Sequence, residues 1–548
     1  MPKKNKNNYF TKGREVEAKA IDTVQALLGG LPRDHELLIE HLHLIQDSVG
    51  HIPLNLLAAL AEEMHLSQAD VYEVASFYAH FTLIDDAAET SPTLTVRVCD
   101  GPACKMDGAD GLLAALQKSL GEHIRVTSTP CMGACDRAPA AAVAFNRVAP
   151  ASIDAIEDAV DKGLTAPTLP DTLDMDAYMK DGGYDLLQAC RAGERSVDDV
   201  LKEIDLSGLR GLGGAGFPVA DKWRFLLDQP KPRVLVVNAD EGEPGTFKDR
   251  HCLETDPHRV LEAALIAAWA IEADSIYIYL RDEYPHIRQL LARELMRLDS
   301  IGLLHETAIH LRRGAGSYVC GEETALLESL EGKRGLPRNR PPYPAQSGLF
   351  GRPTLINNVE TLYWLRDIFR DGGEAYRNAG CQHFYSVSGR VREPGIKQAP
   401  RGISAQQLID EYSGGMAEGH SLKGFLPGGA AGSILPASLA DVPLDFGSLE
   451  EHGGFIGSSA VIVLSDQDNV AEMARDLTGF FEDESCGQCT PCRIGCEKLG
   501  HLLEEATDNE TLIQELAVTM AEASICGLGQ SAANPALSVL KYFRDDVS

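Results

Sequence analysis

The sequence lacks any run of roughly 18 consecutive apolar residues, about the length that a helix needs to cross a bilayer, so no membrane span is expected. It is also short of positive charge, because 50 Lys and Arg stand against 81 Asp and Glu, a formal net charge of −31. That imbalance argues against nucleic acid and anionic membranes as partners. An ordinary solvated acidic surface accounts for most of it.

The N-terminus lacks the apolar segment of a secretory signal. Its first residues are basic, from Lys3 to Arg14, and predict a flexible tail of a cytoplasmic protein. Thirteen cysteines in a chain of this kind indicate metal or redox sites in place of disulfides. A length of 548 residues predicts several domains, roughly four at about 150 residues each.

A glycine-rich turn spans residues 207–218 and contains Gly211-x-Gly213-x-x-Gly216, which formally fits the dinucleotide-binding fingerprint. That fingerprint should follow a strand, whereas residues 197–204 have the spacing of a helix. The motif therefore predicts either a nucleotide site or simply a tight glycine turn before a helix.

A second glycine-rich turn directly follows the apolar run 234–237 and opens with Asn238-Ala-Asp240-Glu241-Gly-Glu243. Ligands of open α/β sheets bind at the carboxyl ends of strands, so these polar groups are where a cofactor is expected. The glycines would let backbone N–H groups approach it closely.

Strands and helices alternate from residue 232 to 371, which predicts a parallel sheet covered by helices. The expected strands are 234–237, 275–280, 307–312 and 354–356, and the expected helices are 258–273, 285–298, 322–330 and 359–369. Asn357 and Asn358 lie where the last strand gives way to its helix. They are candidates for a phosphate site, although helix capping alone would explain one of them.

Four cysteines form two pairs in the N-terminal third, each pair at the end of a predicted strand (93–98 and 123–128). The pairs have the spacings C-x4-C and C-x3-C and consist of Cys99, Cys104, Cys131 and Cys135. Four such thiolates suit a [2Fe–2S] cluster, with structural zinc as the alternative. A helix over 109–120 and a strand over 141–145 complete the expected unit.

The C-terminal part, from about Asn469, is expected to be helical and contains Cys486-x2-Cys489-x2-Cys492. This spacing strongly indicates a [4Fe–4S] cluster. By spacing alone the fourth ligand is either Cys496 or Cys526. Cysteines outside these sets have no cysteine neighbour and are expected to be buried apolar residues.

Two further blocks carry a family resemblance: Gly314-Ala-Gly-Ser-Tyr-Val-Cys-Gly-Glu-Glu-Thr-Ala-Leu-Leu-Glu328 and Pro353-Thr-Leu-Ile-Asn-Asn-Val-Glu-Thr-Leu362. With the turn at 238–250 they resemble the flavin- and NADH-binding subunit of respiratory complex I. The same motifs are similar to the diaphorase subunits of NAD-linked hydrogenases and formate dehydrogenases. Residues 15–85, which predict amphipathic helices, and the N-terminal cysteine region resemble the two-iron, two-sulfur subunit of complex I.

The resemblance implies a multidomain α/β protein built from five parts. These are an N-terminal helical domain (1–85), a thioredoxin-like [2Fe–2S] ferredoxin domain (86–165), a Rossmann-like FMN- and NAD-binding domain (166–380), a β-grasp domain (381–465) and a C-terminal helical [4Fe–4S] bundle (466–548). It also implies that Cys526, and not Cys496, is the fourth ligand of the [4Fe–4S] cluster.

The resemblance further assigns the nucleotide sites. FMN contacts are implied at Gly211, Gly213, Lys222, Asn238, Asp240, Glu241, Tyr318, Gly321, Glu322, Asn357, Asn358 and Thr361. NAD(H) contacts are implied at Phe217, Phe225, Glu243, Glu323, Arg340 and Tyr343. Direct hydride transfer needs positioning and no acid or base, so no catalytic side chain is expected. Flavin exchanges electrons in pairs with NAD(H) and singly with clusters, so it should lie between them.

Three departures from the complex I pattern narrow the expectation. Leu212 stands where Arg is usual between the first glycines, Arg340 and Tyr343 stand where Lys and Phe are frequent, and the two modules are fused in one chain. The fused form with all eight cysteines looks most like the β subunit of metal-dependent, NAD-linked formate dehydrogenases. That resemblance implies a partner α subunit that holds a molybdenum- or tungsten-pterin and further iron–sulfur clusters. The alternatives are a hydrogenase diaphorase, a complex I-like subunit, or a scaffold without NAD turnover.

Overall fold

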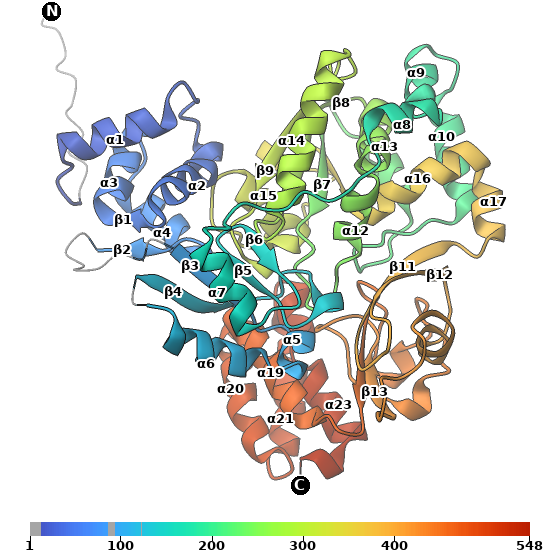
Figure 1. The fold of residues 1–548 in the computed structure, drawn as a ribbon. Helices are drawn as coiled ribbons and strands as arrows, with labels where there is room; N and C mark the ends of the chain where they lie inside the picture. The colour runs from blue at the N-terminus through green and yellow to red at the C-terminus, as the bar shows by residue number, and fades with distance from the viewer. Residues whose placement is uncertain (1–12, 86–91, 93, 122, 548) are drawn as a thin grey trace, which may run out of the picture.

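The computed structural model describes residues 13–85, 92, 94–121 and 123–547; the basic tail expected before residue 13 lies outside this part. Figure 1 shows the N-terminal helices at the upper left and the parallel-sheet domain at the upper right. The unit with the first four cysteines lies near the centre, and the C-terminal helices form the bottom of the molecule.

The N-terminal part is helical, as predicted, and packs against the parallel-sheet domain. Its helices are α1 (Ala18–Leu28), α2 (Leu38–Val49), α3 (Leu54–Glu63) and α4 (Gln68–Phe77). Ser67 caps α4 by accepting from the N–H of Asp70. Just after α4, the hydroxyl of Tyr78 donates to the carbonyl of Lys333 at 2.7 Å, which fixes this domain on the sheet domain.

The next unit is a four-stranded sheet with the order β4-β3-β5-β6, flanked by helices. Its elements are β3 (Leu94–Cys99), α5 (Pro102–Met106), α6 (Ala109–Ser119), β4 (Ile124–Thr129), β5 (Ala141–Val143), β6 (Asn146–Val148) and α7 (Ile153–Asp161). The strand predicted over 141–145 is present but two residues shorter: β5 ends at Val143, and a turn leads into β6. Ala144 adopts a positive φ of 52° at this turn, where Gly or Asn would have been the recognisable signal.

A four-stranded, fully parallel sheet forms the centre of the large domain, in the order β10-β7-β8-β9, which confirms the predicted alternation. Its strands are β7 (Arg233–Ala239), β8 (Ala273–Leu280), β9 (Ala308–Arg313) and β10 (Thr354–Asn358). Its larger covering helices are α13 (Pro257–Ala270), α14 (Pro285–Ser300), α15 (Glu323–Leu330) and α16 (Val359–Asp371). Smaller helices are α8 (Met175–Lys180), α9 (Asp185–Arg191), α10 (Val197–Ser207), α11 (Val219–Leu227), α12 (Lys248–Thr255) and α17 (Gly373–Asn378).

The fourth unit is a mixed sheet with the order β12-β11-β15-β13-β14. Its strands are β11 (Gln382–Gly389), β12 (Gly395–Pro400), β13 (Leu422–Leu426), β14 (Leu435–Pro436) and β15 (Ala460–Ser465). β11 and β15 are the first and last of these strands along the chain, and they pair in parallel near the middle of the sheet. β11 and β12 form an antiparallel hairpin. One short helix of this unit, α18 (Ala405–Gln407), continues as a π-helical turn, Leu408–Tyr412.

The C-terminal part consists of five helices that follow the cap residue Asn469, whose side chain accepts from two N–H groups of the first turn. They are α19 (Val470–Asp483), α20 (Thr490–Leu502), α21 (Glu510–Ala523), α22 (Gly527–Ser531) and α23 (Asn534–Tyr542). The cysteines of this part lie before and within α20 and directly before α22.

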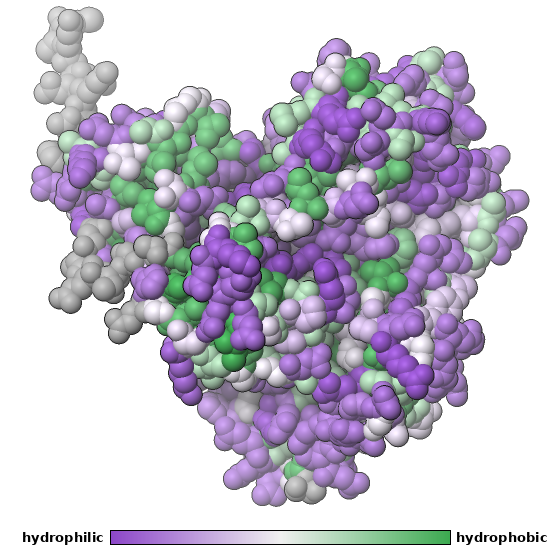
Figure 2. All heavy atoms as spheres, viewed as in Figure 1, coloured by the Kyte–Doolittle hydropathy of each residue, from purple (hydrophilic) through white to green (hydrophobic). Residues whose placement is uncertain are grey.

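Successive residues of β7 point into two different cores, as expected of a parallel strand buried on both faces. Val234 and Val236 join a core that also contains the N-terminal helices and α19, whereas Leu235 and Val237 join the core of α13 and α16. The sheet therefore ties the N-terminal and C-terminal parts together. The face in Figure 2 is mostly hydrophilic over the C-terminal helices, with apolar residues visible over the N-terminal helices. Among the described residues, no helix combines the length and apolar content that a membrane crossing requires.

Candidate functional site

The carboxyl ends of β7 and β10 bring two predicted asparagines together. The strands are parallel neighbours, and Asn238 is the register partner of Asn358. The amide nitrogen of Asn238 donates to the carbonyl of Gly321 at 2.9 Å. Asn358 caps α16 by accepting from the N–H of Thr361 at 3.0 Å, and Asn357 accepts from the indole of Trp223. Helix capping thus accounts for one of the two asparagines at this strand end.

The first glycine-rich turn lies against the same strand ends. It connects α10 to α11, so the strand of a dinucleotide fingerprint is absent here and a turn between helices takes its place. The N–H of Leu212 donates to the hydroxyl of Thr361 at 2.9 Å, and a Cβ at Gly213 would come within 3.2 Å of Asn358. Gly216 has a φ of 63° and leaves no room for a side chain beside Phe446. The turn is thereby held against the polar strand ends.

Asp240 carries a buried carboxylate oxygen, Oδ2, that has no hydrogen-bond partner among the described residues. The residue follows β7 directly, and a Cβ at Gly321 would lie 3.6 Å from this oxygen. Burial raises the pKa of Asp240 well above its usual value. A buried carboxyl oxygen without a partner needs a hydrogen bond, and a hydroxyl group of a bound flavin nucleotide would supply one whether the acid is ionised or protonated. The residues at this edge fit such a group.

Lys222 on α11 and Glu323 at the start of α15 form an ion pair across the site. Three large rings predicted to contact NAD(H) are exposed: Phe217 is 44% exposed, Phe225 53% and Tyr343 55%, and Phe225 lies on α11 with Lys222. The rings of Phe217 and Phe225 lie 6.0 Å apart between centroids. Exposed aromatic faces of this kind offer stacking surfaces for the bases of a nucleotide.

Glu322 directly precedes Glu323 of this ion pair, and Arg340 lies beside Glu322. The carboxylate of Glu322 caps α15 by accepting from the N–H groups of Thr324 and Ala325 at 2.9 Å each. The guanidinium of Arg340 lies 4.0 Å from the carboxylate of Glu322.

The carboxylate of Glu241 is used inside the protein. It accepts from the N–H groups of Asp249 and Arg250 at 2.6 and 2.9 Å and from the hydroxyl of Tyr284 at 2.8 Å. The side chain thus caps the first turn of α12, and these bonds occupy most of its acceptor positions.

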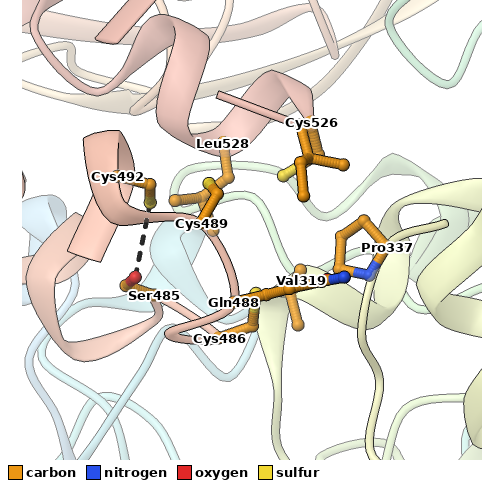
Figure 3. A pocket seen from close by; sticks show the side chains of 10 residues that line it. Val319, Pro337, Ser485, Cys486, Gln488, Cys489, Cys492, Cys526 and Leu528 are labelled. Atoms are coloured by element: carbon orange, nitrogen blue, oxygen red, sulfur yellow. Dashed lines mark hydrogen bonds between the residues drawn. The ribbon is translucent and has the colours of Figure 1, made fainter. Parts of the chain in front are cut away.

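The C-terminal cysteines line one cavity, shown in Figure 3. Cys486, Cys489, Cys492 and Cys526 all belong to its wall, together with the apolar side chains of Val319, Pro337, Ile525 and Leu528. Cys496 is fully buried one turn beyond Cys492 in α20 and is not part of the wall. Four thiols around one apolar cavity fit a cubane cluster.

The turn Tyr318–Gly321 separates this cavity from the strand-end site. Val319 lines the cysteine cavity, while Gly321 accepts from Asn238 on the other side. The N–H of Tyr318 donates to the carboxylate of Glu484 at 2.8 Å, two residues before Cys486. The Tyr318 hydroxyl bonds Glu243, which also accepts from the N–H of Ala431 at 2.7 Å. Sequence analysis missed Val319 and Glu484 as links, because nothing in their local sequence shows what they face.

The N-terminal cysteines are all buried and gathered at the ends of β3 and β4. The sulfurs of Cys131 and Cys135 lie 3.3 Å apart. The hydrogen bonds of the Cys99 thiol to Cys104 and Cys131, with its burial, raise its pKa well above the usual value. Two such pairs meeting at one place fit a dinuclear cluster, in which each iron takes two thiolates.

Two buried arginines join this cysteine loop to the strand-end site. Arg281, at the end of β8, donates to the carbonyl of Cys131 at 2.6 Å and also to the carbonyl of Glu241. Arg250 donates to the carbonyl of Gly133 and pairs with Asp136 at 3.2 Å. The strand-end site therefore lies between the two cysteine sets, with Glu241 and Arg281 on one side and Tyr318 on the other.

A further buried charged group, also missed by sequence analysis, lies beneath the site. The ammonium of Lys248 is 3.0 Å from the carboxylates of both Asp249 and Glu360. Asp249 in turn accepts from the side-chain amide of Asn358 at 3.2 Å. These contacts connect α12 to α16 and hold the strand-end asparagine in place.

Comparison with known proteins gives matches over most of the chain. Residues 204–367 match the Nuo51 FMN-binding domain, residues 472–548 match the NADH-ubiquinone oxidoreductase-F iron–sulfur binding region, and residues 24–162 match the thioredoxin-like [2Fe–2S] ferredoxin. The NADH-quinone oxidoreductase-F protein of Aquifex aeolicus is 40% identical over 391 residues, which is 68% of this chain and 90% of that protein. The mitochondrial NADH dehydrogenase flavoprotein 1 of Dictyostelium discoideum is 40% identical over 380 residues, 65% of this chain and 79% of that protein.

A solved structure resembles almost the whole chain. It is an NAD+-reducing [NiFe]-hydrogenase in the H2-reduced state, with a TM-score of 0.82 and 30% identity over 94% of this chain and 93% of that one. The fold and the matched domains define an NAD-linked oxidoreductase subunit with an FMN-binding domain, a [4Fe–4S] region and a [2Fe–2S] domain. The chain belongs to the NADH-quinone oxidoreductase-F family, here joined to a thioredoxin-like ferredoxin domain.

Proposed function

We propose that the chain is the NAD(H)-linked diaphorase subunit of a cytoplasmic formate dehydrogenase complex. The observation that carries the diaphorase part is the position of the strand-end site, with its unpaired Asp240 oxygen, between the two cysteine sets. When bound there, FMN would exchange a hydride with NAD(H) and single electrons with the clusters.

The residues of this chain would bind and orient the two nucleotides. The glycine turn at Gly211 and Gly213 would let the backbone pass close to the flavin, with Lys222, Asn238 and the Asp240 oxygen as polar contacts. The exposed rings of Phe217, Phe225 and Tyr343 would stack on the bases of NAD(H), and Arg340, 4.0 Å from Glu322, would supply a cation. Tyr318 and Val319 would separate the flavin from the [4Fe–4S] cluster by a single turn of chain.

The eight cysteines would hold the clusters in the sets that the structure gathers. Cys99, Cys104, Cys131 and Cys135 would bind the [2Fe–2S] cluster, and Cys486, Cys489, Cys492 and Cys526 the [4Fe–4S] cluster.

The choice of formate as the ultimate substrate rests on the fusion of the modules and on Leu212. Its side chain is buried in the core, so the turn presents no cation at this position, unlike the usual complex I pattern. The second candidate is the diaphorase of an NAD-reducing hydrogenase, which the likeness to that solved structure supports. In both cases the substrate-oxidising metal centre is on another chain.

Metal analysis of the native complex, purified through this chain, separates the two candidates. Molybdenum or tungsten with a pterin in the co-purified partner, together with formate-dependent NAD+ reduction, is the expected result. Nickel in the partner and hydrogen-dependent NAD+ reduction would replace formate dehydrogenase with hydrogenase.

A further inference from the structure

A serine directly before the first cysteine of the C-terminal cavity points at one of the cavity's sulfurs. The hydroxyl oxygen of Ser485 lies 3.3 Å from the sulfur of Cys492, the contact drawn as a dashed line in Figure 3. Both residues line the cavity. They come from different segments, the loop before Cys486 and the first turn of α20, so the contact connects two segments that line the cavity.

The direction of this hydrogen bond follows from the other contact of the serine. The N–H of Gly487 donates to the Ser485 oxygen at 3.4 Å, which leaves the hydroxyl proton available for a second partner. A cysteine that binds iron does so as a thiolate, which has no proton to donate. With the cluster in place, Ser485 is therefore the donor and the Cys492 sulfur is the acceptor.

We infer that Ser485 is a positioning residue that raises the reduction potential of the C-terminal cluster through a hydrogen bond to the Cys492 sulfur. The inference rests on the proposed ligand set, in which Cys492 binds the cluster. Hydrogen bonds to cluster sulfurs are among the features that set such potentials. A donor stabilises the more negatively charged, reduced cluster more than the oxidised one, because hydrogen bonding favours the more charged form.

The location gives this effect a role in electron transfer. Cys492 is 4% exposed, so water contributes little to the solvation of its sulfur, and the serine hydroxyl is one of the few polar groups that contact it. The cavity wall also contains Val319, one residue from Tyr318 at the strand-end site. A higher potential at this cluster favours the movement of electrons from the flavin to the cluster and opposes the reverse.

The test is a redox titration of the full chain, loaded with FMN and both clusters and followed by low-temperature EPR. Ser485→Ala should shift the midpoint potential of the [4Fe–4S] cluster to a more negative value, while the flavin potential stays unchanged. Ser485→Thr, which keeps the hydroxyl, should restore the native potential. The matched control is Ser531→Ala, because that hydroxyl donates to the Gly527 carbonyl at 2.8 Å within α22, and it should cause no shift.

An intact cluster with native potential in Ser485→Ala, or an equal shift in Ser531→Ala, overturns the inference. If the alanine variant does not hold the cluster, Ser485→Val against Ser485→Thr compares equal shapes with and without the hydroxyl. If the valine variant also fails to hold the cluster, the hydrogen bond is tested in the native protein after exchange into D2O. Pulsed EPR should then detect an exchangeable deuteron strongly coupled to the reduced cluster, and the absence of any such deuteron rejects the inference.

Cys492→Ser tests the ligand assignment separately. Loss or conversion of the [4Fe–4S] signal in Cys492→Ser, together with an unchanged potential in Ser485→Ala, rejects the role of Ser485 and keeps Cys492 as a ligand. A fully native signal in Cys492→Ser rejects the proposed ligand set itself.

Discussion

Glu241 and Glu323 lie on either side of the strand-end site, and their carboxylates contact different partners. Glu241 accepts three hydrogen bonds from α12 and Tyr284, so most acceptor positions of its carboxylate are used inside the protein. Glu323 pairs with Lys222 at the edge and keeps 35% of its side chain exposed. At the residue scale, Glu323 is therefore the carboxylate that can meet a nucleotide from solvent.

We expect a strong preference for NAD(H) over its phosphorylated form, because Glu323 should accept hydrogen bonds from a ribose hydroxyl. A 2′-phosphate at this position would face a carboxylate, which costs on the order of several kcal/mol when desolvated. Glu323→Gln should narrow the ratio of kcat/KM for NADH and NADPH by about tenfold or more, whereas Glu323→Asp should preserve it. Equal kcat/KM values for both nucleotides in the native enzyme would contradict this role.

The fourth ligand of the C-terminal cluster is the second prediction at this scale. Cys526→Ser should lose or convert the [4Fe–4S] cluster, because Cys526 lines the cavity, whereas Cys496→Ser should retain it. Iron counting and low-temperature EPR on both variants provide the measurement. Retention of the signal in Cys526→Ser and its loss in Cys496→Ser would reverse the assignment.

At the scale of elements, α12 is the junction between the ferredoxin domain and the sheet domain. Glu254 on α12 lies 3.3 Å from Arg147 on β6 and 2.7 Å from His286 on α14. Burial alone would raise the pKa of Glu254, but the hydrogen bond from His286 and the charges of Arg250 and Arg147 outweigh it and lower the pKa to about 2.

The lowered pKa of Glu254 predicts a junction that weakens in acid. Its contribution is fully present above the ordinary carboxyl pKa and is lost as the pH falls towards 2, a loss of about 3 kcal/mol. Glu254→Gln should produce the same weakening at neutral pH, seen as faster hydrogen exchange over residues 131–137. The control Glu306→Gln removes an exposed ion pair with Arg191 and should have little effect. If hydrogen exchange over residues 131–137 in Glu254→Gln is as slow as in the native protein, this carboxylate does not stabilise the junction.

How far the sequence predicts these elements depends on how local their determinants are. The apolar run of β7 and the close cysteine spacings are short-range patterns, and the strand and the run Cys486-x2-Cys489-x2-Cys492 follow from them. The place of Cys526 in the cavity wall does not follow from spacing and was expected only from the family resemblance. The β5–β6 hairpin was missed because Ala144 takes a positive φ without any glycine signal. Arg281 was missed because its partner Cys131 lies 150 residues away, and only the tertiary fold brings them together.

At the scale of the whole molecule, three parts that could be separate domains share one core. The N-terminal helices, one face of the parallel sheet and the C-terminal helices contribute to a continuous apolar cluster. The cysteine loop of the ferredoxin unit is held by buried Arg250 and Arg281 of the sheet domain. Both cysteine sets are thus fixed relative to the strand-end site, as electron transfer between them requires.

The central claim, that this chain alone passes electrons from NADH through FMN to its clusters, is tested most directly with the isolated chain. With FMN and both clusters confirmed present, anaerobic NADH should bleach the flavin and iron–sulfur absorbance, and the chain should then reduce ferricyanide with continued NADH oxidation. It should oxidise neither formate nor hydrogen without its partner. No bleaching and no ferricyanide reduction by the fully loaded chain would contradict the claim and favour an iron–sulfur scaffold without NAD turnover.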